Sequence, residues 1–394
     1  MDPVFAYLAA GKLHWKEGDR PAVPLESKFG ESVRQRAVEL HRRHAWKAEG
    51  RGAQFMRGGM LWAGADRDPS EMRIAITGVT AGEQSGELFY TLDTPDISGL
   101  FLLRNGGSDE LRIYHTADFR LAEVAAHPES RRLALVLRDK AGSSSLAVMS
   151  FDGGQFTEVT QGDSMYAAPQ WLPGERGQLV FQSAGIARDD SGSYNGRGPF
   201  SIQRLDLESG EMTALAEDAA FDFLCPHVAG DGTLYCIRRP YEPPHPRIKP
   251  LRMLLDVLLF PFRLLYAVFQ FFNFFTMKYT GNPLLTAGNA RQRTPDLRQM
   301  MIWGNLVNAT ESQKQRPGEE PPDLVPKNWE LVRFAAQSAG NCETLARGVL
   351  SFDLAGDGAL VYSNGTAVFR WDGSGRTGPL VKDSLIHMVA AVRR

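Results

Sequence analysis

Four ionisable side chains of this sequence could form a binding or catalytic centre: His127, Asp222, His227 and Asp353. Each lies next to an apolar run that is typical of a β-strand. If these strands surrounded one axis, the imidazoles and carboxylates would meet there and could hold a ligand or a metal ion. The simpler interpretation is that they cap strand starts or hydrogen-bond to neighbouring strands. Because their spacing is not that of metal ligands, we favour this interpretation and assign no metal site.

Motifs of the common catalytic classes are absent from the sequence. It contains no Gly-x-Ser-x-Gly, no phosphate-binding loop, no His-Glu-x-x-His and no calcium loop. We therefore assign no catalytic residue and expect no cofactor. The three cysteines, Cys225, Cys236 and Cys342, form neither a disulfide framework nor a zinc-site spacing, which indicates a reducing compartment.

The composition is that of a folded protein. The chain has 394 residues, of which 43% are hydrophobic and 23% charged, and its formal net charge is −2. These values exclude a wholly disordered chain, and they give no reason to expect a general polyanion binder. The length is sufficient for a large buried core in one or two domains.

From about residue 50 onward, short runs rich in Val, Ile, Leu, Phe and Tyr alternate with Gly-, Asp- and Ser-rich turns. These runs recur in two frames. One frame relates Leu111–Tyr114 to Leu146–Met149, 35 residues later. The other, a proline or polar start before a turn and a strand, occurs at His127–Val136, Ala168–Phe181, Cys225–Tyr235 and Ser351–Val361. Several short strands in a period of about 40 residues are typical of a β-propeller.

The segment Ala168–Ser183 resembles the repeat of TolB-like propellers, whose pattern is roughly P-x-W-S-P-D-G before an apolar strand. The resemblance covers about residues 97–240 and 345–392, and it implies a fold rather than an activity. We therefore predict an all-β chain that forms a single propeller. Six blades are expected, with five or seven as alternatives, at residues 50–95, 97–125, 127–161, 167–217, 222–240 with 328–346, and 349–392. Ring closure is expected where Ser384–Val392 pairs near Gly59–Trp62.

The remaining segments precede or interrupt the predicted propeller. Residues 1–49 are expected to form an arm that ends in a helix over Glu31–Ala48. The propeller then occupies residues 50–240 and 328–394, and a polar loop, Gly185–Phe200, lengthens one of its turns. Residues 241–327 form a basic, helical insertion within one blade, and the composition of its end, Glu311–Lys327, is typical of disorder.

The segment Met253–Met277 of the insertion contains seven Phe and six Leu. Asp256, Arg263 and Gln270 are spaced by seven residues, so they share one face of a helix that is otherwise apolar. We predict that this helix contacts a membrane or a partner through its apolar side chains: Leu254, Leu255, Leu258, Leu259, Phe260, Phe262, Leu265, Phe269, Phe272 and Phe275.

Basic residues flank the apolar run: Arg247, Lys249, Arg252 and Lys278. They favour attachment to an anionic membrane surface. Because blades lie on both sides of the insertion, a single membrane crossing would separate two halves of one ring. We therefore predict a helix that lies in the membrane interface, with an oligomer or partner groove, or packing on its own propeller, as alternatives. Nucleic acid is disfavoured because the phenylalanines form one apolar run instead of alternating with Lys and Arg.

The N-terminus does not resemble a secretory signal. Asp2 precedes a short apolar stretch, and the first basic residue is Lys12, which is the reverse of the order in an export signal. We therefore expect a cytoplasmic, membrane-associated protein. The sequence favours a non-enzymatic scaffold that binds a protein partner, and it does not identify that partner. A hydrolase or lyase with its site at the central channel, and a homo-oligomer assembled through the inserted helix, are the alternatives.

Overall fold

The structure, a computed structural model, describes residues 3–48, 74–139, 142–174, 177–243, 299–302, 305–308, 321–335, 342–355, 358–373 and 375–392. The chain divides into two compact units, Met1–Tyr241 with Ala309–Arg394, and Glu242–Asn308. In the second unit, β19 (Gln299–Ile302) and β20 (Asn305–Asn308) form an antiparallel pair. The predicted helix Met253–Met277 and its basic flanks lie outside the described residues. Within the described ranges, no helix is both long and apolar enough to cross a membrane.

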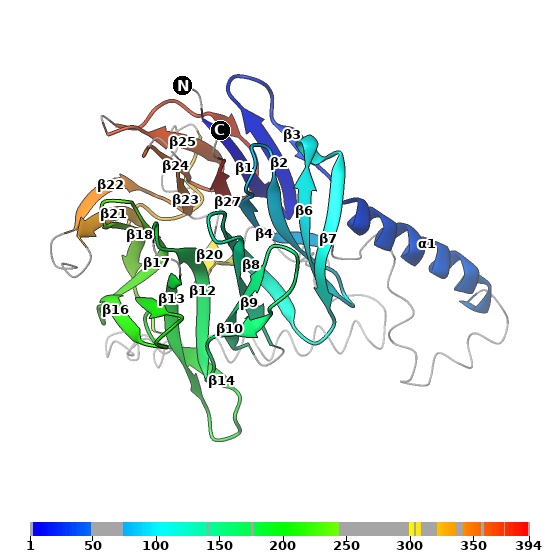
Figure 1. The fold of residues 1–394 in the computed structure, drawn as a ribbon, viewed down its shortest axis with the longest axis horizontal. Coiled ribbons are helices and arrows are strands. Elements are labelled where there is room, and N and C mark those ends of the chain that lie inside the picture. The colour runs from blue at the N-terminus through cyan, green and yellow to red at the C-terminus, as the bar shows by residue number, and fades with distance from the viewer. Residues whose placement is uncertain are drawn as a thin grey trace, which may run out of the picture. The chain divides into compact units, whose positions relative to one another are not determined.

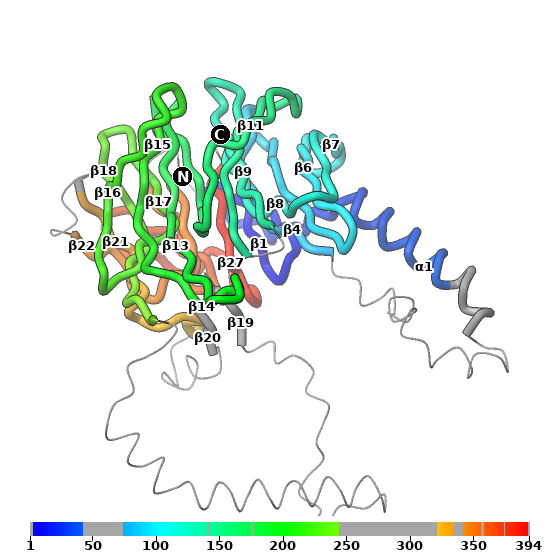
Figure 2. The backbone as a smooth tube through the Cα atoms, turned by 90° about the horizontal axis from the view of Figure 1, so that it is seen from below, coloured from blue at the N-terminus to red at the C-terminus, as the bar shows by residue number. Residues whose placement is uncertain are grey.

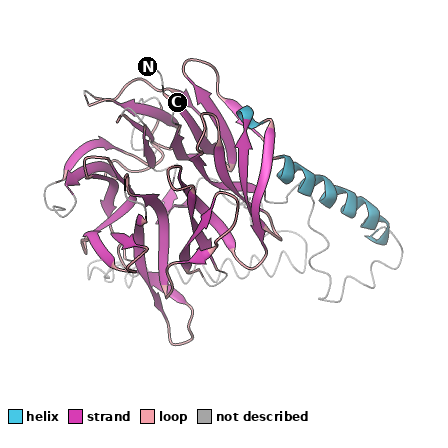
Figure 3. Cartoon of the chain, in the orientation of Figure 1, coloured by secondary structure: helices cyan, strands magenta, loops and turns pink. Residues whose placement is uncertain are grey.

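The first unit contains six antiparallel sheets, here called blades 1 to 6 (Figures 1 and 3). Blade 1 has the order β27 (Ile386–Ala391), β1 (Val4–Ala9), β2 (Lys12–Glu17) and β3 (Val23–Leu25). Blade 2 consists of β4 (Ala75–Ala81), β5 (Leu88–Asp93), β6 (Ser98–Arg104) and β7 (Asp109–Thr116). Blade 3 consists of β8 (Arg120–His127), β9 (Arg132–Arg138), β10 (Ser144–Ser150) and β11 (Thr157–Glu158).

The other three blades follow the same order along the chain. Blade 4 consists of β12 (Ser164–Trp171), β13 (Gln178–Arg188), β15 (Ser201–Asp206) and β16 (Met212–Ala216), and β14 (Tyr194–Arg197) pairs with β13 alone. Blade 5 consists of β17 (Phe221–Val228), β18 (Thr233–Pro240), β21 (Glu330–Ala335) and β22 (Glu343–Arg347). Blade 6 consists of β23 (Ser351–Leu354), β24 (Leu360–Ser363), β25 (Ala367–Trp371) and β26 (Val381–Lys382).

The inner strands of the blades form a closed ring. Each of β4, β8, β12, β17, β23 and β27 contacts the next, and β27 contacts β4. The chain is therefore a six-bladed β-propeller, as the repeat pattern predicts. A ring of inner strands places the ionisable side chains of six separate sequence segments around one axis.

The blades pack on each other through apolar faces. Leu133, Leu135 and Leu137 of β9 pack with Phe89 of blade 2, whereas Ala134 and Val136 pack against blade 4. Because both faces are covered, the strand is one continuous apolar run instead of an alternation of apolar and polar residues.

Ring closure uses a strand that the sequence reading placed elsewhere. The predicted closing strand exists as β27, but its partner is β1, with Phe5 opposite Ala391 and Tyr7 opposite Val389. The predicted pairing near Gly59–Trp62 is therefore wrong, and so is the arm predicted before the helix, because β1, β2 and β3 belong to blade 1. The two blades predicted at 50–95 and 97–125 are also wrong, since residues 75–116 form one blade.

The predicted helix at the N-terminal side is present as α1 (Lys28–Ala48). It begins at Ser27, whose hydroxyl accepts the N–H of Gly30 at 3.0 Å. The carboxylate of Glu110 on β7 accepts the N–H groups of Lys28 and Phe29 at 2.7 and 3.0 Å. These contacts fix the first turn on blade 2, and the helix extends from there away from the blades (Figures 1 and 2).

The predicted disorder of Glu311–Lys327 is wrong for residues 321–327. Leu324 and Val325 are buried, and the N–H of Leu324 donates to the carbonyl of Asn364 at 2.9 Å. The amide of Asn364 in turn donates to Asp323 at 2.9 Å. These residues therefore pack on blade 6 before the chain enters β21.

Two leucine substitutions test the role of β1 in closure. Leu8 is fully buried with residues of blade 2, whereas Leu40 on α1 is 58% exposed. We expect Leu8→Ala to lower the free energy of unfolding by about 2–5 kcal/mol, and Leu40→Ala to change it by less than about 0.5 kcal/mol. Urea denaturation measures both values. Equal, small effects would contradict the placement of β1 in the ring.

Candidate functional site

Several of the six inner strands contain an irregularity in their pairing. The register shifts within β4, β8, β12 and β17 against the second strand of each blade. In β12 and β17 the shift falls at Ala168 and Cys225, which have positive φ angles of 49° and 52° and precede proline. A positive φ is costly for a residue with a side chain, so these bulges hold the backbone in a fixed, strained conformation.

The bulges correct one of the predicted repeat frames. Ala168–Phe181 and Cys225–Tyr235 begin at bulges, but His127 lies at the end of β8, with the shift between Leu121 and Glu123. Glu123 therefore occupies the position in blade 3 that the sequence reading gave to His127. The sequence reading missed Glu123 because no proline follows the bulge in β8.

Of the four predicted candidates, His227 and Asp353 contact each other, with Nε2 and Oδ1 2.9 Å apart. The other carboxylate oxygen of Asp353 accepts the N–H of Ala391 at 2.7 Å. The Nδ1 atom of His227 lies 3.2 Å from the carbonyl oxygen of Cys225, and the ring lies 4.8 Å from that of Phe352. The pair thus connects blades 5, 6 and 1.

His127 and Asp222 have other partners. The Nδ1 atom of His127 lies 2.6 Å from the hydroxyl of Ser130, which belongs to the turn after β8. The imidazole also packs against the indole of Trp171 on the next blade, at 5.3 Å between ring centroids. Asp222 is fully buried at the start of β17.

Asp222 binds two arginines. It accepts two hydrogen bonds of 2.8 Å from the guanidinium of Arg197, and Arg239 donates from Nε at 3.0 Å. The backbone N–H of Phe200 donates to the same carboxylate at 2.8 Å. Both arginines are buried. A carboxylate with four charge-assisted or backbone donors is held in a single orientation.

Aromatic residues next to both ends of the insertion contact these arginines. Arg197 lies 5.5 Å from the ring of Tyr241, which follows β18, and Arg239 lies 4.4 Å from the ring of Trp329, which precedes β21. The hydroxyl of Tyr241 donates to the carbonyl of Arg197. We call Arg197, Asp222, Arg239, Tyr241 and Trp329 the Asp222 cluster. It joins the hairpin of blade 4 to the two residues between which the insertion leaves and re-enters blade 5.

Electrostatics favour the ionised carboxylate in this cluster. Burial raises the pKa of Asp222, but the hydrogen bonds and charges of Arg197 and Arg239 outweigh it, and the net pKa shift is downward. Burial lowers the pKa of Arg239, against the opposing effect of Asp222. The sequence reading identified Asp222 but missed both arginines, because neither lies in a motif with it.

A second polar group lies between blades 3, 4 and 5. The carboxyl of the buried Glu123 accepts the N–H of Ala168 at 2.6 Å, and the side-chain carbonyl of Gln182 accepts the N–H of Cys225 at 2.8 Å. Burial raises the pKa of Glu123, and it also raises that of the Cys225 thiol. These groups satisfy the backbone N–H groups that the bulges release. Among the described residues, no set of three His, Cys, Asp or Glu side chains could hold a metal ion.

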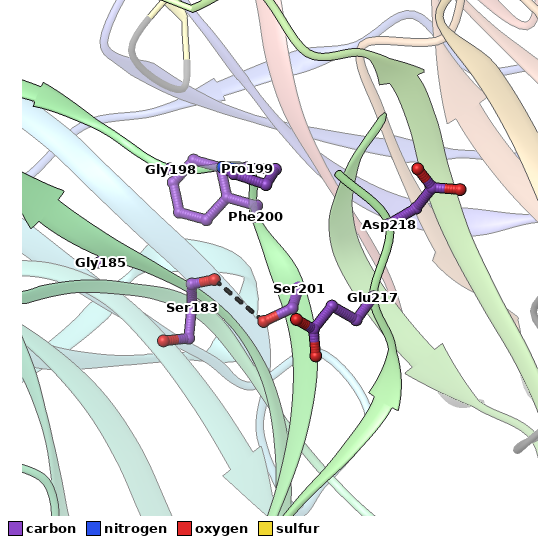
Figure 4. Close-up of a pocket in the computed structure, with 8 residues that line it drawn as sticks. All are labelled: Ser183, Gly185, Gly198, Pro199, Phe200, Ser201, Glu217 and Asp218. Atoms are coloured by element: carbon purple, nitrogen blue, oxygen red, sulfur yellow. Dashed lines mark hydrogen bonds between the residues drawn. The ribbon is translucent and has the colours of Figure 1, made fainter. Parts of the chain in front are cut away.

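A pocket of about 260 Å³ lies beside the Asp222 cluster, on blade 4 (Figure 4). Ser183 and Gly185 come from β13, and Ser201 opens β15. Glu217 and Asp218, both exposed, belong to the turn between β16 and β17. The remaining lining residues are Gly198, Pro199 and Phe200. The sequence predicts a lengthened turn at Gly185–Phe200 but indicates no site there.

The fold and the inner ring define the class of this protein as a six-bladed β-propeller. Among solved structures, the Nidogen/Laminin complex matches with a TM-score of 0.51 and 8% identity over 98% of this chain and 97% of the other. TolB from Acinetobacter baumannii matches with a TM-score of 0.50 and 9% identity over 99% of this chain and 66% of the other. At these identities the likeness shows the fold, which is that of TolB, as the repeat pattern predicts. No protein-family model matches the chain, and no curated protein matches it either.

Substitution of Asp222 tests the role of the cluster. Asp222→Asn leaves two buried guanidinium groups without their carboxylate, so we expect the free energy of unfolding to fall by about 3–5 kcal/mol. Asp218→Asn, at an exposed carboxylate on the adjacent turn, is the matched control and should change it by less than about 0.5 kcal/mol. Urea denaturation at several pH values measures both variants.

The pH dependence of this difference follows from the lowered pKa. The carboxylate stabilises the folded state fully above its unfolded pKa of about 3.9, and this contribution is lost as the pH falls through the lower folded-state value. The difference between the natural chain and Asp222→Asn should therefore be constant between about pH 7 and pH 5. A difference that already disappears near pH 5 would contradict a carboxylate with a lowered pKa.

Proposed function

We propose that this chain is a non-enzymatic scaffold that binds protein partners and attaches to anionic membrane surfaces through the inserted segment Met253–Met277. The observation that supports the proposal most is that His227 and Asp353 contact each other and join two blades. Both nitrogens of His227 face oxygen acceptors, the carboxylate of Asp353 and the carbonyl of Cys225. Both ring nitrogens are therefore engaged within the protein, one of them across the boundary between blades 5 and 6.

A channel-centred hydrolase or lyase would need a base with a free lone pair close to the axis. Asp353 is also engaged at both oxygens, by His227 and by the N–H of Ala391. The Asp222 carboxylate is saturated by four donors. The ionisable groups that the sequence brings to the inner ring are thus used to join blades, which supports a binding role over a catalytic one.

The insertion is separable from the hydrogen bonding of blade 5. The strands on either side of it, β18 and β21, pair in continuous register from Thr233 opposite Ala335 to Arg238 opposite Glu330. Tyr241 and Trp329 each contact one of the two arginines that bind Asp222. A segment of any length can therefore leave and re-enter at this point at a small entropic cost, because loop closure depends only weakly on length.

The composition of the insertion supports its attachment to a membrane. Burying one Phe or Leu side chain contributes about 2 kcal/mol, and each basic residue near an anionic surface adds about 1 kcal/mol. A few of the ten apolar residues predicted above would therefore suffice for attachment. The basic flank makes the attachment sensitive to salt and to the charge of the lipid.

Vesicle flotation tests this proposal. We expect the full chain to float with vesicles of phosphatidylcholine and phosphatidylserine, and to float less with phosphatidylcholine alone or at high salt. A variant in which a short Gly/Ser linker replaces residues 244–320 keeps Tyr241, Trp329 and the packed residues 321–327. It should remain folded, with an unchanged urea midpoint, and stay in the soluble fraction.

Phe262→Ser with Phe269→Ser is the matched test within the full chain, and Leu40→Ser, at an exposed position of α1, is its control outside the insertion. The double variant should lose most of its flotation and the control should retain it. A full chain that never floats, or a linker variant that floats equally well, would contradict membrane attachment through this segment. Aggregation of a folded linker variant would favour an oligomer or partner interface instead.

A further inference from the structure

The pocket beside the Asp222 cluster has the properties of a site for one side chain. Its volume of about 260 Å³ is below the range of about 300–1,000 Å³ that is usual for small-molecule sites. Its walls come from β13, the start of β15 and the turn before β17. The backbone beneath it is fixed, because Phe200 is buried and its N–H donates to Asp222 at 2.8 Å.

Two glycines determine the depth of the pocket. Neither Gly185 nor Gly198 has a positive φ, and no heavy atom lies within 4 Å of the place that a Cβ atom would occupy. The backbone therefore requires glycine at neither position, and a side chain there would enter free space. The space above the two residues is open for a side chain from another molecule.

One side of the pocket presents oxygen atoms, from Ser183, Ser201 and Glu217, that can accept hydrogen bonds. The hydroxyl of Ser201 donates to the carbonyl of Ser183 at 3.3 Å (Figure 4). It accepts the side-chain amide of Gln203 at 2.8 Å, so its oxygen retains one further lone pair. Figure 4 shows the carboxylate of Glu217 on the side of Ser201, whereas that of Asp218 points away from it. Within the described part of the chain, Glu217 has no ion pair, and none of the eight lining residues is Lys or Arg.

We infer that this pocket binds a lysine side chain of a protein partner. An ammonium group is a compact cation with three donors, and it matches one carboxylate beside the hydroxyl oxygen of Ser201. The four-carbon stem of the lysine would lie over Gly185 and Gly198. Asp222 pairs with both Arg197 and Arg239, so the cluster carries one net positive charge, and the two carboxylates of Glu217 and Asp218 at the pocket outweigh it. The inference rests on the proposed function, since it specifies where the scaffold contacts its protein partner.

A pair of lysine analogues tests this site on the full chain. Nα-acetyl-lysine methylamide is the probe, and Nα-acetyl-norleucine methylamide, which lacks the ammonium group, is its control. Titration followed by nuclear magnetic resonance should shift the backbone amide signals of Gly185 and Gly198 with the lysine probe alone. Equal shifts with the norleucine probe, or shifts confined to other residues, would overturn the inference.

Three variants separate the site from the fold. Glu217→Gln removes the charge and should weaken binding of the lysine probe by about tenfold or more. Gly198→Ala fills the pocket without backbone strain and should weaken it similarly. Glu211→Gln changes an exposed carboxylate of the same blade that does not line the pocket, and its affinity should be that of the natural chain. Unchanged binding by Glu217→Gln in a folded protein would overturn the inference.

The result of the lysine-probe titration is independent of the result of the flotation experiment. If the lysine probe fails to bind while the full chain still floats with anionic vesicles, the pocket assignment is wrong and the membrane attachment stands. If the probe binds and the full chain does not float, the pocket stands and membrane attachment is wrong.

Discussion

Closure of the ring depends on one pair of strands from opposite ends of the chain. The inner strand of blade 1, β27, comes from the last residues of the chain, and the other three strands of that blade come from the first 25. Without this pairing, two blade faces made of Leu, Phe and Tyr would be exposed, together with an open strand edge. Residues such as Leu8 and Phe5 therefore stabilise all six blades through a contact of very high sequence separation. The polar contacts between inner strands can stabilise the propeller only when the ring is closed, because they join neighbouring blades.

The second constraint is the strain of the inner strands. Bulges at Ala168 and Cys225 aim backbone N–H groups away from the ladder, and Glu123 and Gln182 accept them across blade boundaries. Asp353 does the same for Ala391. Ionisable side chains at a propeller axis are therefore required for joining blades before any ligand is considered. This explains why a His–Asp pair can lie on the inner strands and join two blades.

The sequence predicted the fold better than it predicted the site. The period of the apolar runs was sufficient for six blades, for β27 and for the boundaries of blades 4 and 5, because packed blades require continuous apolar strands. It assigned β8 to the blade before its own and β27 to blade 6. The prediction for the first blade was wrong because residues 1–27, with their Pro and Gly and the polar strand β2, were interpreted as an arm, although β1 is as apolar as the other strands. His227 and Asp353 could be selected as axis residues, but their pairing depends on the order of blades 5 and 6. The arginines of the Asp222 cluster could not be selected, because burial of an arginine depends on a carboxylate in another strand.

The insertion is compatible with this architecture because Tyr241 before it and Trp329 after it both contact the arginines of one buried cluster. Asp222 starts an inner strand, and its two arginines contact both Tyr241 and Trp329, so the exit and re-entry of the chain are fixed by the same carboxylate that orders the hairpin root of blade 4. The proposed lysine pocket lies at this root as well. The proposed partner site and the residues on both sides of the insertion thus contact the same buried cluster.

Native-state hydrogen exchange of the amides in β1 and β27 tests ring closure most directly. If the two strands close the ring, their hydrogen-bonded amides exchange only when the whole propeller unfolds, with the same free energy as the amides of β9 (Arg132–Arg138) in the middle of the chain. Exchange of β1 and β27 that is faster than that of β9 by several orders of magnitude would show that the chain ends open independently. That result would contradict a ring closed by its two termini.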